Sequence, residues 1–440
     1  MKTVFTICIL ALISYGAVSA QILTVESLND FNAAIAKSDS KIRLQPGHYD
    51  IKDISGREKA IAFSGSNNIV DMRGVYVNAT VGTVSSAYIR VTGHGNTIVG
   101  GEFEDTYKDG KKEIKDFGAY NRDRRNLASG LRGEPVMKVK GNKNSVKGIK
   151  LTVRGSFPYG YGSMFGIGRD HEFGLNKRCG ILIKGVENTL DGVEVQQRAF
   201  GHGIYMQGDA DKTLIKNSHV EGRLRKTKEL YDETKPTDLP KRANYKIPRD
   251  GNIPIPKDSV HSLCEDGIRM YNIPGSVTVE NCTVTKMRGG IRLYLGGPAT
   301  VKNCSVTHCE YTNYNLPTKG ELSDSTGDFS FGPLSDYRLS RSRSRAEWVI
   351  LPSPHAIGDH NILDVQGNGH HIILNRKKGS PIDRKEKRTI VVTGRSSTII
   401  NNTEYTITLA DSAKGNKITS YAPVIGNLSA NTVTKLKSLK

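Results

Sequence analysis

Gly180-Ile-Leu-Ile-Lys184 returns with the same alternation as Gly203-Ile-Tyr-Met-Gln207, Gly267-Ile-Arg-Met-Tyr271 and Gly290-Ile-Arg-Leu-Tyr294. The second and fourth residues are aliphatic or Met, whereas the third and fifth are mainly polar or aromatic. Because side chains of a β-strand alternate between its two sides, each stretch predicts a strand with one apolar side. Gly203 follows Gly180 by 23 residues, and Gly290 follows Gly267 by 23. A strand that recurs at such a period is typical of a solenoid.

An Asn-centred phrase supports the same repeat. Each copy is followed within three residues by an aliphatic side chain, and the copies begin at Asn68, Asn96, Asn144, Asn188, Asn217, Asn281 and Asn303. Asn tolerates left-handed backbone and can bond along a stack of identical residues, so it suits a corner that recurs once per coil. No long segment has the period of a helical repeat. The sequence therefore predicts an all-β, right-handed parallel β-helix, with the hand given by the usual crossover rule.

The organisation of the chain follows from this repeat. Leu28, Phe31 and Ile35 share one face of a short predicted helix, which we expect to cap the N-terminal end of the solenoid. Residues 21–440 are expected to form one β-helix domain, because a solenoid remains a single domain at this length. Two segments break the period, near 223–260 and 311–348, and we expect both to leave the coil as cleft-forming insertions.

Residues 1–20 predict a secretory signal peptide. Lys2 precedes a nearly continuous apolar run, and Val18-Ser19-Ala20 supplies small residues for cleavage before Gln21. We therefore expect a secreted or periplasmic protein. No later stretch is long and apolar enough to span a bilayer, so no membrane association is expected.

The charge of the chain indicates its partner. The formal net charge is +19, which favours binding to a polyanion. Outside the cytoplasm an acidic polysaccharide or oligosaccharide fits better than nucleic acid, because the sequence has no aromatic RNA-binding motif or recognition-helix pattern. We expect a monomer. Cys282 and Cys304 fall one coil apart, where either stacked buried thiols or a disulfide fits.

Stacking of the four strands predicts a binding platform. Equivalent residues of successive coils lie about 4.8 Å apart and form columns. One column contains Leu182, Tyr205, Arg269 and Arg292, and the next contains Lys184, Gln207, Tyr271 and Tyr294. We expect these side chains to be exposed and to bind anions and sugars. Two arginines one coil apart repel each other unless an anion binds there, or unless Glu265, Asp266 or Glu310 pairs with them.

Titratable residues gather around these columns. His202 directly precedes the second strand, and Asp266 takes the equivalent place before the third. A His among other titratable groups on one face is a candidate for proton transfer, although a lone His is more often structural. Upstream, an aromatic stretch contains Tyr159 and Tyr161, which either stack on sugar rings or cover the coil edge.

The coil pattern and this arrangement resemble the pectate-lyase-like superfamily of parallel β-helix proteins, which includes polysaccharide lyases, polygalacturonases and other glycosidases. Gly201-His202-Gly203 is similar to the Gly-His-Gly of polygalacturonases, but the Asn-Thr-Asp and Asp-Asp phrases that precede it there are absent. Lyase members resemble this chain in having Lys or Arg on successive coils and in their acidic substrates. The resemblance implies an enzyme of polysaccharide degradation without an organic cofactor. Calcium, which some members use, is the one candidate metal, but Glu265 and Asp266 alone are too few ligands to define a site.

The lyase interpretation assigns a role to each residue. Arg269 and Arg292 would neutralise a uronate carboxylate, which acidifies the adjacent C5 proton. His202 would remove that proton, and Tyr205 would protonate the glycosidic oxygen that leaves in the β-elimination. Contacts to the rest of the substrate would come from Lys184, Gln207, Glu265, Asp266, Tyr271, Tyr294, Tyr159 and Tyr161. Of these, Lys184, Tyr271 and Tyr294 are further candidates for the acid or the base.

Two other classes of function stay open. A glycoside hydrolase acting on an acidic glycan would need two carboxylates about 5 to 9.5 Å apart, for which Asp209, Glu265 and Asp266 are candidates. A non-catalytic glycan-binding solenoid fits the same sequence pattern, because a fold does not dictate a function.

Overall fold

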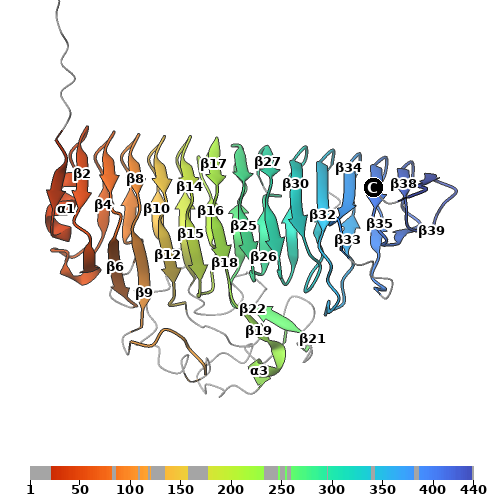
Figure 1. The fold of residues 1–440 in the computed structure, drawn as a ribbon, viewed down its shortest axis with the longest axis horizontal. Coiled ribbons are helices and arrows are strands. Elements are labelled where there is room, and N and C mark those ends of the chain that lie inside the picture. The colour runs from red at the N-terminus through yellow and green to blue at the C-terminus, as the bar shows by residue number, and fades with distance from the viewer. Residues whose placement is uncertain are drawn as a thin grey trace, which may run out of the picture.

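The computed structural model describes residues 21–81, 86–107, 110–116, 119, 134–156, 177–231, 246–247, 253–254, 259–294, 296–337, 342–380 and 386–438. Within these residues the chain winds into a β-helix whose coils lie side by side along one axis (Figure 1). Strands of successive coils pair in parallel and in register. The parallel β-helix expected from the 23-residue period is therefore confirmed.

Each of the early coils contributes one strand to each of three faces. Face 1 contains β1 (Leu23–Val25), β2 (Lys41–Leu44), β5 (Ile69–Asp71), β8 (Thr97–Val99), β11 (Ser145–Lys147), β14 (Thr189–Asp191), β17 (Thr213–Lys216), β24 (Val277–Glu280), β27 (Ala299–Lys302), β30 (Glu321–Gly327), β32 (Arg345–Ile350), β34 (His371–Arg376), β36 (Thr398–Asn402), β38 (Lys417–Ser420) and β40 (Thr432–Lys435). Face 2 contains β3 (Gly47–Asp50), β6 (Val75–Thr80), β9 (Glu102–Thr106), β12 (Lys150–Val153), β15 (Glu194–Gln197), β18 (His219–Glu221), β25 (Thr283–Thr285) and β28 (Ser305–Thr307).

Face 3 contains the four recurring stretches that begin at Gly180, Gly203, Gly267 and Gly290. It contains β4 (Ile61–Phe63), β7 (Ile89–Val91), β10 (Glu134–Val139), β13 (Arg178–Ile183), β16 (Ile204–Met206), β23 (Asp266–Met270), β26 (Gly289–Arg292), β29 (Thr312–Asn315), β31 (Ser335–Tyr337), β33 (Leu363–Val365), β35 (Ile390–Val392), β37 (Ile407–Leu409) and β39 (Val424–Gly426). Four isoleucines stack in register on this face and are completely buried, as predicted: Ile181, Ile204, Ile268 and Ile291.

The glycines of the repeat let face 3 lie close to face 2. A β-carbon on Gly203 would lie 2.5 Å from a methyl group of Val220 in β18. The same contact would be 2.3 Å from Gly267 to Val284, and 2.2 Å from Gly290 to Val306. No side chain fits at such distances, so glycine is required at this position of each coil.

The second expected insertion, near 311–348, is wrong. β29, β30, β31 and β32 lie in this segment and pair as ordinary coil strands. Faces 1 and 2 merge at β30, which pairs with both β27 and β28 and has a register shift between Leu322 and Ser325. One long strand thus replaces two short strands and their turn, and this change of coil shape removes the period from the sequence.

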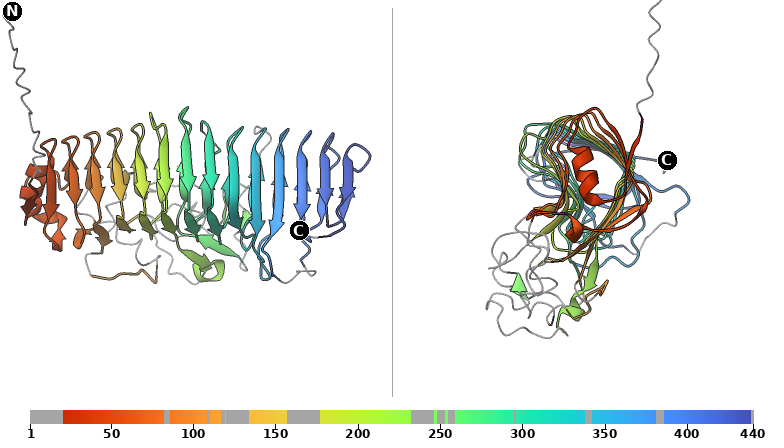
Figure 2. Two further views of the ribbon diagram at one scale, coloured as in Figure 1. Left: turned by 45° about the horizontal axis from the view of Figure 1, so that its top comes forward. Right: turned by 90° about the vertical axis from the view of Figure 1, so that its left-hand side faces the viewer.

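The first expected insertion, near 223–260, does leave the coil in the part that the structure describes. β19 (Leu224–Lys226) pairs with β22 (Val260–Ser262) in an antiparallel ladder outside the three faces. α3 (Thr227–Tyr231) follows β19 directly, and β20 (Lys246–Ile247) pairs with β21 (Ile253–Pro254). Figure 2 shows β19, β22 and α3 to one side of the solenoid.

The two ends of the solenoid differ. α1 (Leu28–Ile35) covers the N-terminal end, as expected, and buries Leu28, Phe31 and Ile35 (Figure 2). The Ser27 side chain accepts a hydrogen bond from the Asp30 N–H at 3.1 Å, which caps the helix; η1 (Ile51–Asp53) packs nearby. At the other end, β40 pairs with β38 and with no further strand among the described residues. Its Lys435 is exposed and continues the column that contains Leu374, Asn401 and Ser420.

The recurring asparagines form two different ladders. The buried ladder consists of Asn68, Asn96, Asn144 and Asn188, which are each no more than 1% exposed. Each side-chain oxygen in this ladder accepts the backbone N–H of the corresponding residue of the preceding coil. The other ladder consists of Asn217, Asn281 and Asn303, which take left-handed backbone with φ of 52°, 54° and 49°. These asparagines also bond one another along the stack, from Asn281 Nδ2 to Asn217 Oδ1 at 3.2 Å and from Asn303 Nδ2 to Asn281 Oδ1 at 2.8 Å. Both reasons given for Asn in the sequence therefore apply to this exposed ladder.

Three further expectations concern the whole chain. Cys282 and Cys304 are free buried thiols. Among the described residues, no helix is long and apolar enough to cross a membrane. The expected signal peptide, residues 1–20, lies outside the described residues.

Candidate active site

The predicted columns exist on face 3. Leu182 pairs with Tyr205, Tyr205 with Arg269, and Arg269 with Arg292. We call this line of residues the outward column, because its strand neighbours on either side point into the core. The column continues through Asn315, which pairs with Arg292.

The expectation that this column is an exposed platform is wrong. Tyr205 is 3% exposed, Arg292 6% and Arg269 7%. Leu182 and Tyr205 pack with Cys179 and Tyr271 in a small apolar cluster outside the solenoid core. The sequence period placed these side chains on the outer side of the strand correctly, but it carried no information on what covers them. The partly or fully exposed side chains here are Lys177, Lys184, Gln207, Tyr271, Tyr294 and Tyr311.

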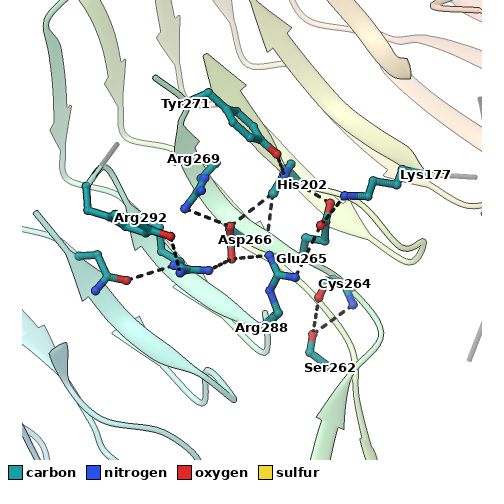
Figure 3. Close-up of polar contacts among 12 residues, drawn as sticks. Lys177, His202, Ser262, Cys264, Glu265, Asp266, Arg269, Tyr271, Arg288 and Arg292 are labelled. Atoms are coloured by element: carbon teal, nitrogen blue, oxygen red, sulfur yellow. Dashed lines mark hydrogen bonds and ion pairs between the residues drawn. The ribbon is translucent and has the colours of Figure 1, made fainter. Parts of the chain in front are cut away.

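Asp266 is the centre of a buried ion cluster (Figure 3). Its Oδ1 lies 2.9 Å from Arg292 Nη1 and 3.2 Å from Arg288 Nη2, and its Oδ2 lies 3.6 Å from Arg269 Nη1. Burial opposes ionisation, but the three guanidinium groups outweigh it and hold the pKa of Asp266 well below its usual range. Asp266 therefore supplies the anion that the paired arginines require.

Glu265 extends the cluster on its other side. Lys177 Nζ lies 2.7 Å from Glu265 Oε1, and Arg288 Nη1 lies 3.6 Å from the same oxygen. His202 Nε2 lies 3.3 Å from Glu265 Oε2. Burial again opposes ionisation, yet His202, Lys177 and Arg288 lower the pKa of Glu265. Both carboxyl groups are therefore ionised at neutral pH. Glu310, the third candidate partner of the arginines, instead contacts His261 and Ser262.

His202 has a defined tautomer. It is 3% exposed, and burial lowers its pKa to about 4 despite the nearby carboxylates, so it is neutral at pH 7. The backbone N–H of Asp266 donates to His202 Nδ1 at 3.2 Å, which leaves the ring proton on Nε2. That proton points to the Tyr271 hydroxyl oxygen, 2.5 Å away. His202 therefore donates to Tyr271, and Tyr271 keeps its own proton for another acceptor.

Tyr271 and Tyr205 are both held in the protonated form. Burial, with a contribution from Glu265, raises the pKa of Tyr271 above its usual value. Burial also raises the pKa of Tyr205, with contributions from Cys179 and Glu134. Of the two, Tyr271 is partly exposed and Tyr205 is buried.

Arg269 is the least satisfied cation of the cluster. Its Nε and Nη1 are buried and have no hydrogen-bond partner in the described part of the protein. Its guanidinium lies between two aromatic rings, 5.0 Å from the centre of Tyr271 and 4.8 Å from the centre of Tyr294. With His202 neutral, four cations (Lys177, Arg269, Arg288 and Arg292) face the two carboxylates Glu265 and Asp266. The site therefore holds excess positive charge next to partly exposed tyrosines.

The structure thus brings together His202, Tyr205, Glu265, Asp266, Arg269, Tyr271, Arg292 and Tyr294, and it adds Lys177 and Arg288, which sequence reasoning missed. Arg288 had a usable signal, because it occupies the position of Glu265 one coil later, where its N–H bonds the Glu265 carbonyl. Lys184 and Gln207 lie on the neighbouring coils of the same face, outside the ion cluster. Tyr159 and Tyr161 lie outside the described residues.

Two observations concern ligand space. Among the described residues, no group of three or more His, Cys, Asp or Glu side chains is arranged to hold a metal ion. A cavity of about 1310 Å³ lies at the C-terminal end of the solenoid, lined by residues such as Tyr421, Leu428 and Val433, and is remote from the ion cluster.

Some solved structures are similar to this chain at low sequence identity. An alginate lyase in complex with G6 is 10% identical; the match covers 94% of this chain and 86% of that chain, with a TM-score of 0.46. A PL6 alginate lyase in complex with a trisaccharide is 11% identical; the match covers 94% of this chain and 88% of that chain, with a TM-score of 0.48. The polygalacturonase from Erwinia carotovora ssp. carotovora is 11% identical; the match covers 95% of this chain and 95% of that chain, with a TM-score of 0.42. No protein-family model and no curated protein sequence matches the chain.

The parallel, in-register strands of the structure themselves confirm the β-helix expected from the sequence. Similarity at this level assigns no activity. The function has to be argued from the chemistry of the ion cluster.

Proposed function

We propose that the protein is an exported polysaccharide lyase that cleaves an acidic, uronate-containing polysaccharide by β-elimination on face 3. The observation that carries this proposal is Arg269, a buried guanidinium with two N–H groups that have no acceptor among the described residues. Unsatisfied buried donors are costly, and a carboxylate is the acceptor that best matches a guanidinium. Tyr271 and Tyr294 on either side of Arg269 are suited to pack against a sugar ring.

The first step of the reaction is neutralisation of the substrate carboxylate. When Arg269 binds the carboxylate of a uronate, it stabilises the charge that develops there as the C5 proton is removed. Asp266 holds Arg292 and Arg288 in place, so the positive charge is already oriented before substrate binds. A fixed, partly dehydrated cation stabilises that charge more than a solvated one does.

Tyr271 is our candidate for the general acid. Its raised pKa keeps it protonated, and it receives the His202 Nε2–H, so its own O–H can point to the substrate. His202 would act as a positioning residue behind Tyr271, in place of the role as base that its sequence context suggested. Tyr205, buried more deeply, would support the ring of His202, whose centre lies 5.6 Å away.

Lys184 is our candidate for the base. It lies on the same side of face 3 as Tyr271, two coils away, and is partly exposed. Its ammonium has no hydrogen bond or ion pair within the described part of the chain. Lys184 would take the C5 proton; the C–H electrons form the C4–C5 double bond, the C4–O bond breaks, and Tyr271 gives its proton to the leaving oxygen.

The charge state of the carboxyl groups argues against the hydrolase alternative. A glycosidase needs one protonated carboxyl group as general acid, normally with a raised pKa. In this cluster the cations lower the pKa of both Glu265 and Asp266. Asp209, the remaining candidate, is exposed on the turn after β16.

The test is ultraviolet detection of unsaturated uronate during incubation with a panel of acidic glycans. Tyr271→Phe should lower kcat by about 100-fold or more, with little change in KM. Arg269→Met should lower kcat/KM by about 100- to 1000-fold, the scale of losing one charge-stabilising donor.

Arg90→Met is the matched control. Arg90 belongs to the same outward column but lies four coils, about 19 Å, from Arg269. The Arg90→Met variant should cleave the substrate as fast as the unmodified protein does. The proposal fails if no acidic glycan yields unsaturated product, or if Arg269→Met cleaves as fast as Arg90→Met.

A further inference from the structure

The outward column changes sign beyond the ion cluster. After Arg269, Arg292 and Asn315 it continues through Asp336, and Asp336 pairs in register with Asp364 on the next coil. The strand neighbours Ser335, Leu363 and Val365 are completely buried, so the two aspartates lie on the same outer side as the arginines. Two cations, one amide and two carboxylates therefore follow one another along a single line.

Contacts hold this order of residues in place. Asn315 accepts a hydrogen bond from Arg292 Nε at 3.1 Å, and its amide nitrogen donates to the Asp336 backbone oxygen at 2.8 Å. Asp364 Oδ1 accepts from Asn361 Nδ2 at 2.6 Å. Burial raises the pKa of Asp364, and the nearby Asp336 raises it further. Both aspartates are only partly buried.

We propose that this column selects substrates by the position of their charges, with an acidic sugar unit over Arg269 and Arg292 and an uncharged unit over Asp336 and Asp364. This inference rests on the proposed binding of an acidic polysaccharide to face 3. The unpaired N–H groups of Arg269 fix the acidic end of the column, because they require an anion. The aspartates fix the other end, because their carboxylates accept hydrogen bonds from sugar hydroxyls and repel a second carboxylate.

The number of coils between the arginines and the aspartates sets the distance between the two charged ends of the column. Arg292 and Asp364 lie three coils apart, about 14 Å along the solenoid. A glycan chain that lies along the column thus meets the aspartates a few sugar units from its bound uronate. A polymer with a carboxylate on every unit places negative charge against Asp336 and Asp364. The favoured substrate class is therefore a polysaccharide whose uronates are interrupted by uncharged units.

The experiment compares polymers that differ only in charge. Polygalacturonate and alginate are each used in the fully acidic form and with part of their carboxylates esterified. For whichever backbone is cleaved, kcat/KM should be about tenfold higher on the partly esterified form. Asp336→Asn combined with Asp364→Asn should remove this preference by raising the rate on the fully acidic form. Asp411→Asn, which removes an exposed carboxylate outside the column, should leave the preference unchanged.

Binding measurements separate this inference from the proposed activity. The same four polymers are titrated into the unmodified protein and the double variant by calorimetry, which needs no cleavage. Tighter binding of the esterified forms, lost in the double variant, supports the column even if no unsaturated product appears. Equal preference in the two proteins, or tighter binding of the fully acidic forms to both, overturns it.

Discussion

Two ladders built on the same coil repeat differ in how completely they satisfy themselves. In the buried asparagine ladder, Asn144 Oδ1 accepts the Asn96 N–H at 3.0 Å, and Asn144 Nδ2 donates to the Gly93 oxygen at 3.1 Å. Asn96 makes the same two kinds of contact with Asn68 and Gly65. Each side-chain oxygen in this stack accepts a backbone N–H, and each side-chain nitrogen donates to a glycine carbonyl. None of these side-chain atoms is among the buried polar atoms without a hydrogen-bond partner in the described residues.

The outward column is made of different residues, and their charges and hydrogen-bond donors are not all matched by partners within the column. Asp266 satisfies Arg288 and Arg292, but Arg269 Nε and Nη1 remain without hydrogen-bond partners among the described residues. Cations exceed carboxylates in the cluster. The comparison teaches that a column of identical residues satisfies its own hydrogen bonds and stabilises the coil. A column of different residues can leave donors without partners, and these donors are available to bind a ligand. The predictions below test this contrast through stability.

The largest effect is expected for Asp266→Asn. The change keeps the shape of the side chain but leaves Arg288 and Arg292 buried without their anion, which should cost about 3–5 kcal/mol in the free energy of unfolding. Urea denaturation measures the loss. The control is Asp191→Asn, which breaks a half-exposed pair with Lys216 and should cost about 1 kcal/mol or less. Equal losses in the two variants would show that Asp266 does not organise the cluster.

The next effect is a dependence of stability on pH through His202. Burial lowers its pKa to about 4 from the ordinary value of 6.5, so between these pH values the unfolded chain binds more protons than the folded one. The stability that the neutral ring contributes is therefore complete above about pH 6.5 and is lost as pH falls toward 4. The span is on the order of 3 kcal/mol.

Urea denaturation at several pH values from neutral down to the pKa of His202 checks this expectation. His202→Gln should flatten the curve over this range. The carboxyls Glu265 and Asp266, whose pKa values are lowered, add their loss of stability at still lower pH. A variant that retains the full slope would assign the pH dependence to other groups.

A smaller effect is expected in the asparagine ladder. Asn144→Ala leaves the buried Asn96 N–H and the Gly93 carbonyl without partners and should cost about 2–3 kcal/mol. The matched variant is Asn281→Gly, which removes an exposed ladder residue while allowing its left-handed backbone, and should cost about 1 kcal/mol or less. Asn281 also bonds its ladder neighbours, but these bonds are exposed to water. If the exposed position proves as costly as the buried one, burial of the hydrogen bonds is not what makes Asn144 important.

The smallest effect on stability is expected for Arg269→Met. Among the described residues Arg269 has one ion pair, at 3.6 Å, and two buried nitrogen atoms without hydrogen-bond partners, so its replacement by an apolar side chain should change the free energy of unfolding by about 1 kcal/mol or less. Arg292→Met breaks the 2.9 Å contact to Asp266 and should cost about 3 kcal/mol. Denaturation of both variants under the same conditions sharpens the contrast between an arginine kept for the fold and one kept for a ligand. Equal stability losses would contradict it.

Much of the fold could be predicted because glycine, isoleucine and asparagine recur for simple steric reasons. Gly267 faces Val284 across the core, and Ile268 fills the same place as Ile204 and Ile291 in neighbouring coils. The segment 311–348 was misjudged because β30 merges two faces and so changes the spacing. A period detects only coils of constant shape.

Most residues of the candidate site could be predicted from the sequence, but the contacts between their side chains could not. Register alone placed Arg269 beside Arg292 and brought His202 close to Asp266. It could not show that Lys177 reaches Glu265 across 88 residues, or that the Nε2 proton of His202 points at Tyr271. Asp336 was missed because it lies in the segment whose repeat was not recognised. Side-chain reach and burial depend on neighbouring coils, and the strand pattern does not encode them.

The column that reaches Lys435 bears on whether another chain can add to the C-terminal end of the solenoid. Along this column of face 1 the side chains change from Leu374 to Asn401, to Ser420 and finally to the exposed Lys435. The free edge of β40 is a template on which another chain could add a strand. An added strand would bury the ammonium of Lys435 without a partner, which is strongly unfavourable. The graded column therefore disfavours the addition of a strand to β40, and α1 covers the opposite end of the solenoid.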